Sequence, residues 1–259
     1  MAHVETHVDG HVLVIRLTRP EKYNALSFEM YHLLGQALQR LEDDAELRVA
    51  ALIAEGRNFT AGVELDQWAP VFGSGQAIPV NEGEIDPFGL TGPQHSKPVV
   101  IGVQGYCFTW GVELLLNTEM RVAGADTQFQ MLEVQRGLYP CCGATLRLPQ
   151  EIGWGNAHRY LLTGERWNAE DAFRWGLVQE VVPAEQVHEA TLDLARRVAA
   201  AAPLGVRGCL ASARYARTAE REPAVAHMMK HLAPVMQSED AAEGVQSFLE
   251  RRDAVFKGR

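Results

Sequence analysis

Apolar positions along the first 125 residues fall into short runs that alternate with segments of helical period. The run from His11 to Leu17 is apolar and β-branched, and it predicts a strand. After it, Ser27 has the side chain of a helix N-cap, and apolar residues at helical spacing predict a helix to about Asp43. Three further apolar runs predict strands over Arg48–Glu55, Val99–Val103 and Met120–Val122. The alternation of strands and helix predicts an α/β body.

The pattern changes after Pro183, where helical periods replace the apolar runs. Ala184–Ala202 is rich in Ala, Leu and Arg and predicts a helix that Pro203 interrupts. Ser238, followed by two acids, has the features of a helix start. The sequence therefore predicts an α/β body over residues 1–200 and a helical region over 201–259. The helices expected in that region cover Leu204–Thr218, Pro223–Met236 and Ser238–Lys257.

The stretch from Pro70 to Pro98 breaks the α/β pattern with many Gly and Pro residues and polar spacers. A loop of that length inside a compact domain is uncommon, and such loops often serve as lids or binding segments. Two interpretations stay open, a segment that contributes to a site and a solvated insertion.

Composition and charge narrow the class of protein. The chain has 259 residues and a formal net charge of −9, which argues against broad binding to a nucleic-acid backbone. A small anionic ligand is still compatible, because a few local cations and helix N-termini can hold it. No apolar run reaches the roughly 18–20 residues of a membrane span, and the first ten residues lack the apolar core of a signal peptide. We therefore expect a cytoplasmic protein that binds neither membrane nor nucleic acid.

The cysteines and histidines do not suggest a metal site. The four cysteines show no C-x-x-C pair, and the neighbours Cys141 and Cys142 are poorly placed to bridge each other, so free thiols are expected. The nine histidines form no persuasive triad or ligand set. We expect no metal requirement.

Three segments contain residues that could perform chemistry. Phe59–Leu65 holds a small-residue turn after a predicted strand, and Gly105–Leu116 leaves a strand and enters a helix whose free amides suit an oxyanion. Glu113 lies in that helix beside leucines, and Glu133 lies among apolar residues in Phe129–Pro140. Each acid has an ordinary alternative explanation. Glu113 would be a surface acid in a first helical turn, and Glu133 would be a loop acid that pairs with Arg136. Two converging glutamates would instead form a general acid and base pair.

These segments, in this order, resemble the enoyl-CoA hydratase/isomerase (crotonase) family. R-P-E-K-Y-N-A-L (Arg19–Leu26) is similar to the family's R-P-x-x-x-N-A-L, and F-T-A-G-V-E-L (Phe59–Leu65) to F-x-A-G-x-D-L. Gly105–Glu113 is similar to G-x-x-x-G-G-G-x-E, and Ser247–Lys257 to the last helix of the family. The resemblance covers nearly the whole chain.

The resemblance implies a fold, a reaction and roles for residues. The fold would be a spiral of repeated ββα units with C-terminal helices used for forming a homotrimer or hexamer. The backbone N–H groups of Val63 and Trp110 would hold the carbonyl oxygen of an acyl-CoA thioester. Glu113 as base and Glu133 as acid would add water across the C2–C3 double bond, because hydratases of the family use two glutamates at these positions.

The resemblance also implies how coenzyme A is bound. Backbone around Lys22 and Ala61 would meet the adenine end, and Phe248 and Lys257 of a neighbouring subunit would close over it. Coenzyme A would be carried by the substrate, so no separate cofactor is expected. The two lysines suit phosphate groups, although exposed solubilising lysines are the ordinary alternative.

Some positions depart from the family pattern and leave the substrate open. Thr109 and Trp110 replace two of three glycines, Cys141 replaces another glycine, and Glu64 lengthens the usual Asp. The Trp110 side chain would either narrow or line the acyl channel or point into the core. Three functions stay open: a 2-enoyl-CoA hydratase as the leading one, another crotonase-type reaction (isomerisation or C–C hydrolysis of a β-dicarbonyl), and a non-catalytic relative that binds acyl-CoA or RNA.

Overall fold

The structure is a computed structural model that describes residues 3–74 and 78–259. Its centre is a six-stranded sheet with the strand order β1-β2-β3-β4-β6-β9. β1 pairs with β2 in antiparallel fashion, and every other neighbouring pair in this sheet is parallel. The strands of the sheet are β1 (Val4–Asp9), β2 (Val12–Leu17), β3 (Val49–Ala54), β4 (Val99–Val103), β6 (Met120–Gly124) and β9 (Glu180–Val182).

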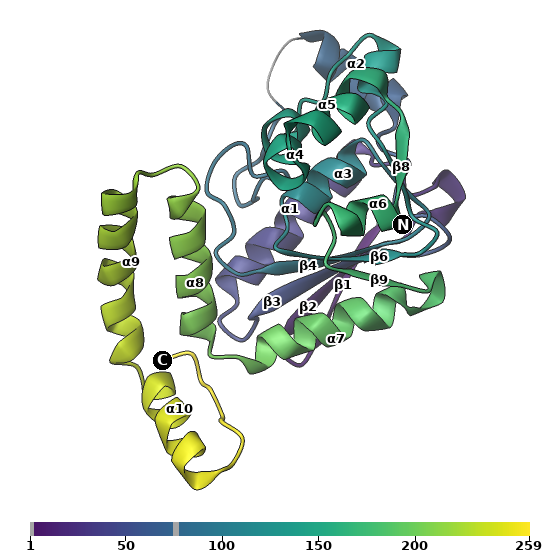
Figure 1. Ribbon diagram of the computed structural model, residues 1–259. Helices are drawn as coiled ribbons and strands as arrows, with labels where there is room; N and C mark the ends of the chain where they lie inside the picture. The colour runs from purple at the N-terminus through teal and green to yellow at the C-terminus, as the bar shows by residue number, and fades with distance from the viewer. Residues whose placement is uncertain (1–2, 75–77) are drawn as a thin grey trace.

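Side chains of alternating direction let the central strands bury both faces of this sheet. In β2, Leu13 and Ile15 belong to the main core, whereas Val12 and Val14 belong to a second cluster with Ala195. Figure 1 shows the corresponding layers, with α7 (Val187–Ala200) along one face and α1 (Phe28–Asp43) on the other. The continuous apolar runs of the sequence are therefore strands covered on both sides, as the α/β prediction requires.

A smaller three-stranded sheet, in the order β5-β7-β8, lies beside the main one. β5 runs directly into α3, and Figure 1 places α3 near α4 and α5 in the upper part of the molecule. The small sheet thereby fixes where α3 begins, which matters for the site. The bounds are β5 (Tyr106–Phe108), β7 (Gln128–Gln130), β8 (Arg166–Asn168), α3 (Trp110–Leu116), α4 (Ala144–Ile152), α5 (Trp154–Thr163) and α6 (Ala169–Arg174).

The predicted strands and the first helix are confirmed to within about two residues at their ends. The Ser27 hydroxyl accepts a hydrogen bond from the Met30 N–H, as an N-cap does. β1 was not predicted, because four consecutive residues of this edge strand, Glu5 to Val8, are exposed and give no apolar alternation. The short strands β5, β7, β8 and β9 were not predicted either, since they have only three residues each and leave little periodic signal.

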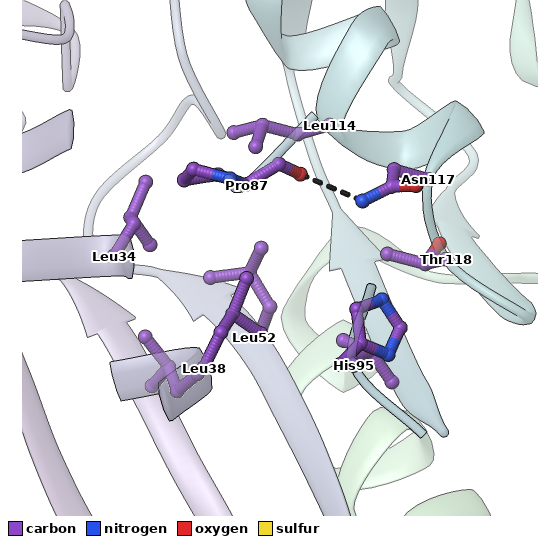
Figure 2. A pocket seen from close by; sticks show the side chains of 10 residues that line it. Leu34, Leu38, Leu52, Pro87, His95, Leu114, Asn117 and Thr118 are labelled. Atoms are coloured by element: carbon purple, nitrogen blue, oxygen red, sulfur yellow. Dashed lines mark hydrogen bonds between the residues drawn. The ribbon is translucent and has the colours of Figure 1, made fainter. Parts of the chain in front are cut away.

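The predicted loop starts too early, because Pro70 lies inside α2 (Leu65–Ser74). From residue 78 to Pro98 the chain is irregular but well anchored. The Asp86 carboxylate accepts hydrogen bonds from the N–H groups of Phe88, Leu90 and Thr91. Figure 2 shows a second anchor, where the Asn117 side chain at the end of α3 donates to the Pro87 carbonyl oxygen at 2.9 Å beside a small apolar void of about 20 Å³.

The carboxyl end of the chain forms the helices α8, α9 and α10, and Figure 1 shows that they extend from the body. None of the residues of α8 or α9 is buried. The last predicted helix was too long: α10 ends at Glu250, where Arg251 takes a left-handed conformation with φ 55°, and Lys257 lies in the non-helical segment beyond. The bounds are α8 (Pro203–Ala216), α9 (Arg221–Met236) and α10 (Glu239–Glu250).

In the part of the chain that the structure describes, no helix combines the length and apolar character needed to cross a membrane. Within the same residues, no group of three or more His, Cys, Asp or Glu side chains is arranged to hold a metal ion.

Candidate active site

A cavity of about 690 Å³ opens beside the amino end of α3. Its wall combines the turn after β3, helix α2, the anchored loop after residue 78 and the segment that follows β7. Most of the side chains that line it are apolar, so the cavity suits a largely hydrophobic group. Examples are Val63, Leu65, Phe72, Phe88, Trp110 and Leu132.

Glu113 lies in the first turn of α3, is fully buried and is not among the residues that line the cavity. One carboxylate oxygen, Oε1, accepts hydrogen bonds from the N–H groups of Cys142 at 2.7 Å and Ala144 at 3.1 Å. Ala144 begins α4, so the positive end of a helix faces this carboxylate. The other oxygen, Oε2, has no partner among the described residues. Burial raises the pKa of Glu113 well above its ordinary value, and the two amides oppose that rise.

Glu133 lines the cavity at the start of the short 3-10 helix Glu133–Arg136. Its Oε2 is buried and, within residues 3–74 and 78–259, has no hydrogen-bond partner. Burial raises the pKa of Glu133 to about 7. The suggested pairing with Arg136 is wrong, because no ion pair joins the two side chains in the described part of the chain. Arg136 is exposed, whereas Glu133 Oε2 is buried.

The two glutamates are close enough to affect each other. The charge of Glu133 contributes to the raised pKa of Glu113. Each carboxyl presents one unpartnered oxygen, and like charges at a shared site disfavour the doubly ionised state. The arrangement therefore favours one proton shared by two carboxyls, which supplies an acid and a base side by side.

Two residues that line the cavity, Val63 and Trp110, have backbone amides that could serve a ligand. Trp110 is the first residue of α3, so its N–H has no acceptor within the helix. Val63 lies in the turn after β3, beside Leu26. Neither N–H donates a hydrogen bond to any residue that the structure describes. The bridge between Thr60 and Cys107 holds the two segments next to each other.

The backbone between these amides is tightly constrained at Thr109. This residue has φ 48° and ψ −109°, a conformation that a β-branched residue rarely adopts. Its N–H donates to Gln130 O at 2.8 Å and its carbonyl oxygen accepts from the Glu113 N–H at 3.1 Å. The family pattern has glycine here, and the structure retains a glycine-like conformation with threonine in place.

Gly62 packs directly against Thr109, which gives a prediction for stability. A Cβ on Gly62 would lie 2.2 Å from Thr109 Oγ1, and φ at Gly62 is +110°. We expect Gly62→Ala to lower the free energy of unfolding in urea by at least about 2 kcal/mol. The control is Gly155→Ala in α5, where a Cβ would meet nothing within 4 Å and φ is not positive. Equal stability of the two variants would contradict the packing described.

The sequence left open whether the Trp110 side chain lines the acyl channel or points into the core. In the structure it does both, because it is packed in the core and forms part of the cavity wall. It is 2 % exposed, and its ring lies edge-on to Trp68 at 4.5 Å and to Phe88 at 4.8 Å between centroids. Trp68 is fixed in turn by a hydrogen bond from its indole N–H to Leu26 O at 2.9 Å. The anchored loop supplies Phe88, so the loop contributes to the cavity and is not merely a solvated insertion.

The residues expected to bind coenzyme A fall into two places. Ala61 lines the cavity and donates its N–H to Tyr23 O, next to Lys22 in the chain. Phe248 is 82 % exposed on α10, and neither it nor Lys257 is among the residues lining the cavity of the same chain. Glu64 pairs with Arg19 at 2.8 Å, which gives this longer acid a structural role.

Sequence reasoning missed the groups that hold Glu113. They are backbone amides of Cys142 and Ala144, and backbone donors leave no side-chain signature. The available signal was Gly143 after Pro140, a combination that ends one segment and begins a helix.

The class of protein is defined by a crotonase-like α/β body in which Glu133 lines an apolar cavity and interacts with the charge of the fully buried Glu113. The family model described as enoyl-CoA hydratase/isomerase matches residues 7–259, and the chain belongs to this family. It is 34% identical over 260 residues to carnitinyl-CoA dehydratase of Salmonella typhimurium (strain LT2), with 97% of each chain covered.

Solved structures give the same result for the fold. A probable enoyl-CoA hydratase/isomerase from Mycobacterium abscessus has a TM-score of 0.95 at 41% identity and covers 99% of each chain. Enoyl-CoA hydratase from Mycobacterium tuberculosis H37Rv has a TM-score of 0.92 at 32% identity and covers 100% of each chain. The predicted crotonase fold is therefore confirmed.

Proposed function

We propose that this chain adds water across the C2–C3 double bond of a 2-enoyl-CoA thioester. The observation that carries the proposal is the pair of carboxyls of Glu113 and Glu133, which each keep one buried oxygen without a partner and lie close enough for their charges to interact. Such a pair can hold one water and supply both proton transfers that hydration needs. The resemblance to a relative named carnitinyl-CoA dehydratase also favours a hydratase-type reaction.

In this proposal the two amides stabilise the charge on the substrate, and the two acids transfer protons. The N–H groups of Val63 and Trp110 donate to the thioester oxygen, which gains negative charge as water attacks C3. One well-placed donor of this kind is worth roughly 3–4 kcal/mol of barrier. Glu113 takes the proton from water in its ionised form, which the two amides favour and burial disfavours. Glu133 delivers a proton to C2. Coenzyme A arrives with the substrate, and no separate cofactor takes part.

The apolar wall around Trp110 favours a hydrophobic acyl group on the substrate. The test compares hydration of crotonyl-CoA with that of enoyl-CoAs carrying bulkier apolar groups, followed by loss of absorbance of the conjugated thioester. Turnover of at least one of these substrates supports the proposal. An enzyme that binds acyl-CoA and turns over none of them would refute it.

The raised pKa values predict the pH dependence of kcat/KM. The active form holds one proton between the two carboxyls, so we expect a bell-shaped profile. Glu133 has a pKa of about 7 and must be protonated to act as the acid. The high-pH limb should therefore fall above about pH 7, approaching tenfold per pH unit. Glu170→Gln, an exposed acid on α6, should leave the profile unchanged. A value of kcat/KM that still rises at pH 9 would contradict this assignment.

The tail helices predict an oligomer. Side chains such as Met236, Phe248 and Leu249 are 68 %, 82 % and 70 % exposed in the single chain, which leaves a large apolar surface uncovered. A neighbouring subunit that covers these helices would also bring Phe248 and Lys257 towards a coenzyme A held at Lys22 and Ala61. We expect sedimentation equilibrium to give a trimer or hexamer. A stable monomer at micromolar concentration would contradict this proposal.

A further inference from the structure

Two adjacent thiols lie at the wall of the cavity, and the proposed reaction uses neither. Cys141 is exposed and lines the cavity, whereas Cys142 is buried. Their sulfur atoms are 3.8 Å apart. The remaining cysteines are Cys107, which is buried, and Cys209, which is exposed on α8.

The surroundings of Cys141 favour a reactive thiol. The neighbouring thiol of Cys142 stabilises the Cys141 thiolate and lowers the pKa of Cys141 to about 7, although burial and the charge of Glu133 act in the opposite direction. A substantial thiolate fraction at neutral pH makes a cysteine nucleophilic. Burial has the opposite effect on Cys107, because it raises the pKa of that thiol and covers it.

Cys141 also lies next to the acid pair in the structure. The next residue, Cys142, donates its N–H to Glu113 Oε1 at 2.7 Å, and Glu133 lines the same cavity as the Cys141 thiol. Glu113 is fully buried, and its other oxygen, Oε2, has no partner among the described residues. A group attached to the Cys141 sulfur would therefore occupy space that the acyl group and the acids need.

We propose that Cys141 is a covalent modification site inside the acyl cavity for soft electrophiles of the α,β-unsaturated carbonyl class. The thiol sulfur forms a bond to the β-carbon, the carbon–carbon π bond breaks, and the thiol proton ends on the α-carbon. The product is a thioether, and the addition needs no oxidant, reductant or further reagent. The adduct blocks entry of an acyl group.

N-Ethylmaleimide belongs to this chemical class and serves as the probe. The intact protein is treated at pH 6.5, and labelling of each cysteine-containing peptide is followed by mass spectrometry. We expect Cys141 to be labelled at least about threefold faster than Cys209, because the Cys142 thiol stabilises the Cys141 thiolate. Labelling of Cys141 at the rate of Cys209 or more slowly would overturn the proposal.

A second measurement tests whether the reactive thiol lies in the cavity. This measurement rests on the proposed function, because it uses an acyl-CoA as the protecting ligand. Acetoacetyl-CoA at ten times its Kd, measured by calorimetry, should slow labelling of Cys141 about tenfold and leave Cys209 unchanged. Binding of acetoacetyl-CoA without protection of Cys141 would overturn the proposal. Failure of acetoacetyl-CoA to bind would count against the proposed function, while the labelling ratio would still decide the reactivity of Cys141.

Matched variants connect the label to its effect. Cys209→Ser should lose hydratase activity on maleimide treatment as fast as the wild type. For Cys141→Ser, the half-time of inactivation by maleimide, measured relative to the untreated variant, should be at least tenfold longer than for the wild type. If Cys141→Ser is inactivated at the wild-type rate, modification of another residue is responsible and the proposal fails. If Cys141→Ser has little activity, acetoacetyl-CoA binding is measured instead. Maleimide treatment should then abolish binding in the wild type and leave it unchanged in Cys141→Ser.

Discussion

Replacing Glu113 by Gln should lower kcat for enoyl-CoA hydration by about 10²–10⁴, the usual contribution of a positioned acid or base. Glutamine keeps an acceptor oxygen for the amides of Cys142 and Ala144, so the local backbone should be preserved. It removes the negative charge that takes the proton from water. Steady-state kinetics with crotonyl-CoA or the best bulkier substrate measures the loss.

Two controls separate chemistry from folding. Glu170→Gln makes the same chemical change at an exposed acid and should leave kcat within about twofold of the wild type. Urea unfolding of Glu113→Gln should show a stable protein, because the change removes a buried ionisable group and keeps its shape. A Glu113→Gln enzyme with wild-type kcat would eliminate the acid–base role proposed for this residue. Adding Glu133→Gln should cost little more, since residues that act as a unit are non-additive.

Replacing Trp110 by Ala should lower the free energy of unfolding by about 3–5 kcal/mol, the range for a buried aromatic truncated in a core. The ring is 2 % exposed and packs on Trp68 and Phe88, so its removal leaves a hole that these neighbours cannot fill. Trp110 also lines the cavity, and its loss should raise the ratio of kcat/KM for bulky over small acyl groups.

Trp110→Phe is the matched comparison, because it keeps an aromatic ring and removes only part of the volume. We expect it to lie between the wild type and Trp110→Ala both in stability and in acyl preference. Urea unfolding and kcat/KM for two substrates of different size measure the two effects. A loss below about 1 kcal/mol for Trp110→Ala would mean that the aromatic cluster is not part of the core.

The sequence predicts the centre of the fold better than its edges. Strands such as Val49–Ala54 are buried along their whole length and appear as continuous apolar runs. The edge strand Val4–Asp9 needs only one covered residue, Val4, and its pairing partner is visible only in three dimensions. The end of α10 was also missed, because Arg251 stops the helix in a left-handed conformation and no glycine signals it.

The candidate site is predictable only in part for a similar reason. The family resemblance points to Glu113 and Glu133, yet the sequence cannot show that the two side chains come close enough for their charges to interact. Their convergence depends on β5 and β7 pairing, which sets α3 beside the segment after β7. The orientation of Trp110 depends on Trp68 and Phe88, which come from separate segments and meet only in the folded chain.

The most direct test of the account is the identity of the product. The wild-type chain is incubated with a 2-enoyl-CoA in water enriched in heavy oxygen, and the acyl-CoA is analysed by mass spectrometry. We expect a product heavier than the substrate by one water, with the heavy oxygen on C3, and no such product from Glu113→Gln over the same time. A product of unchanged mass with a shifted double bond, or cleavage of a carbon–carbon bond, would contradict hydration by the two glutamates.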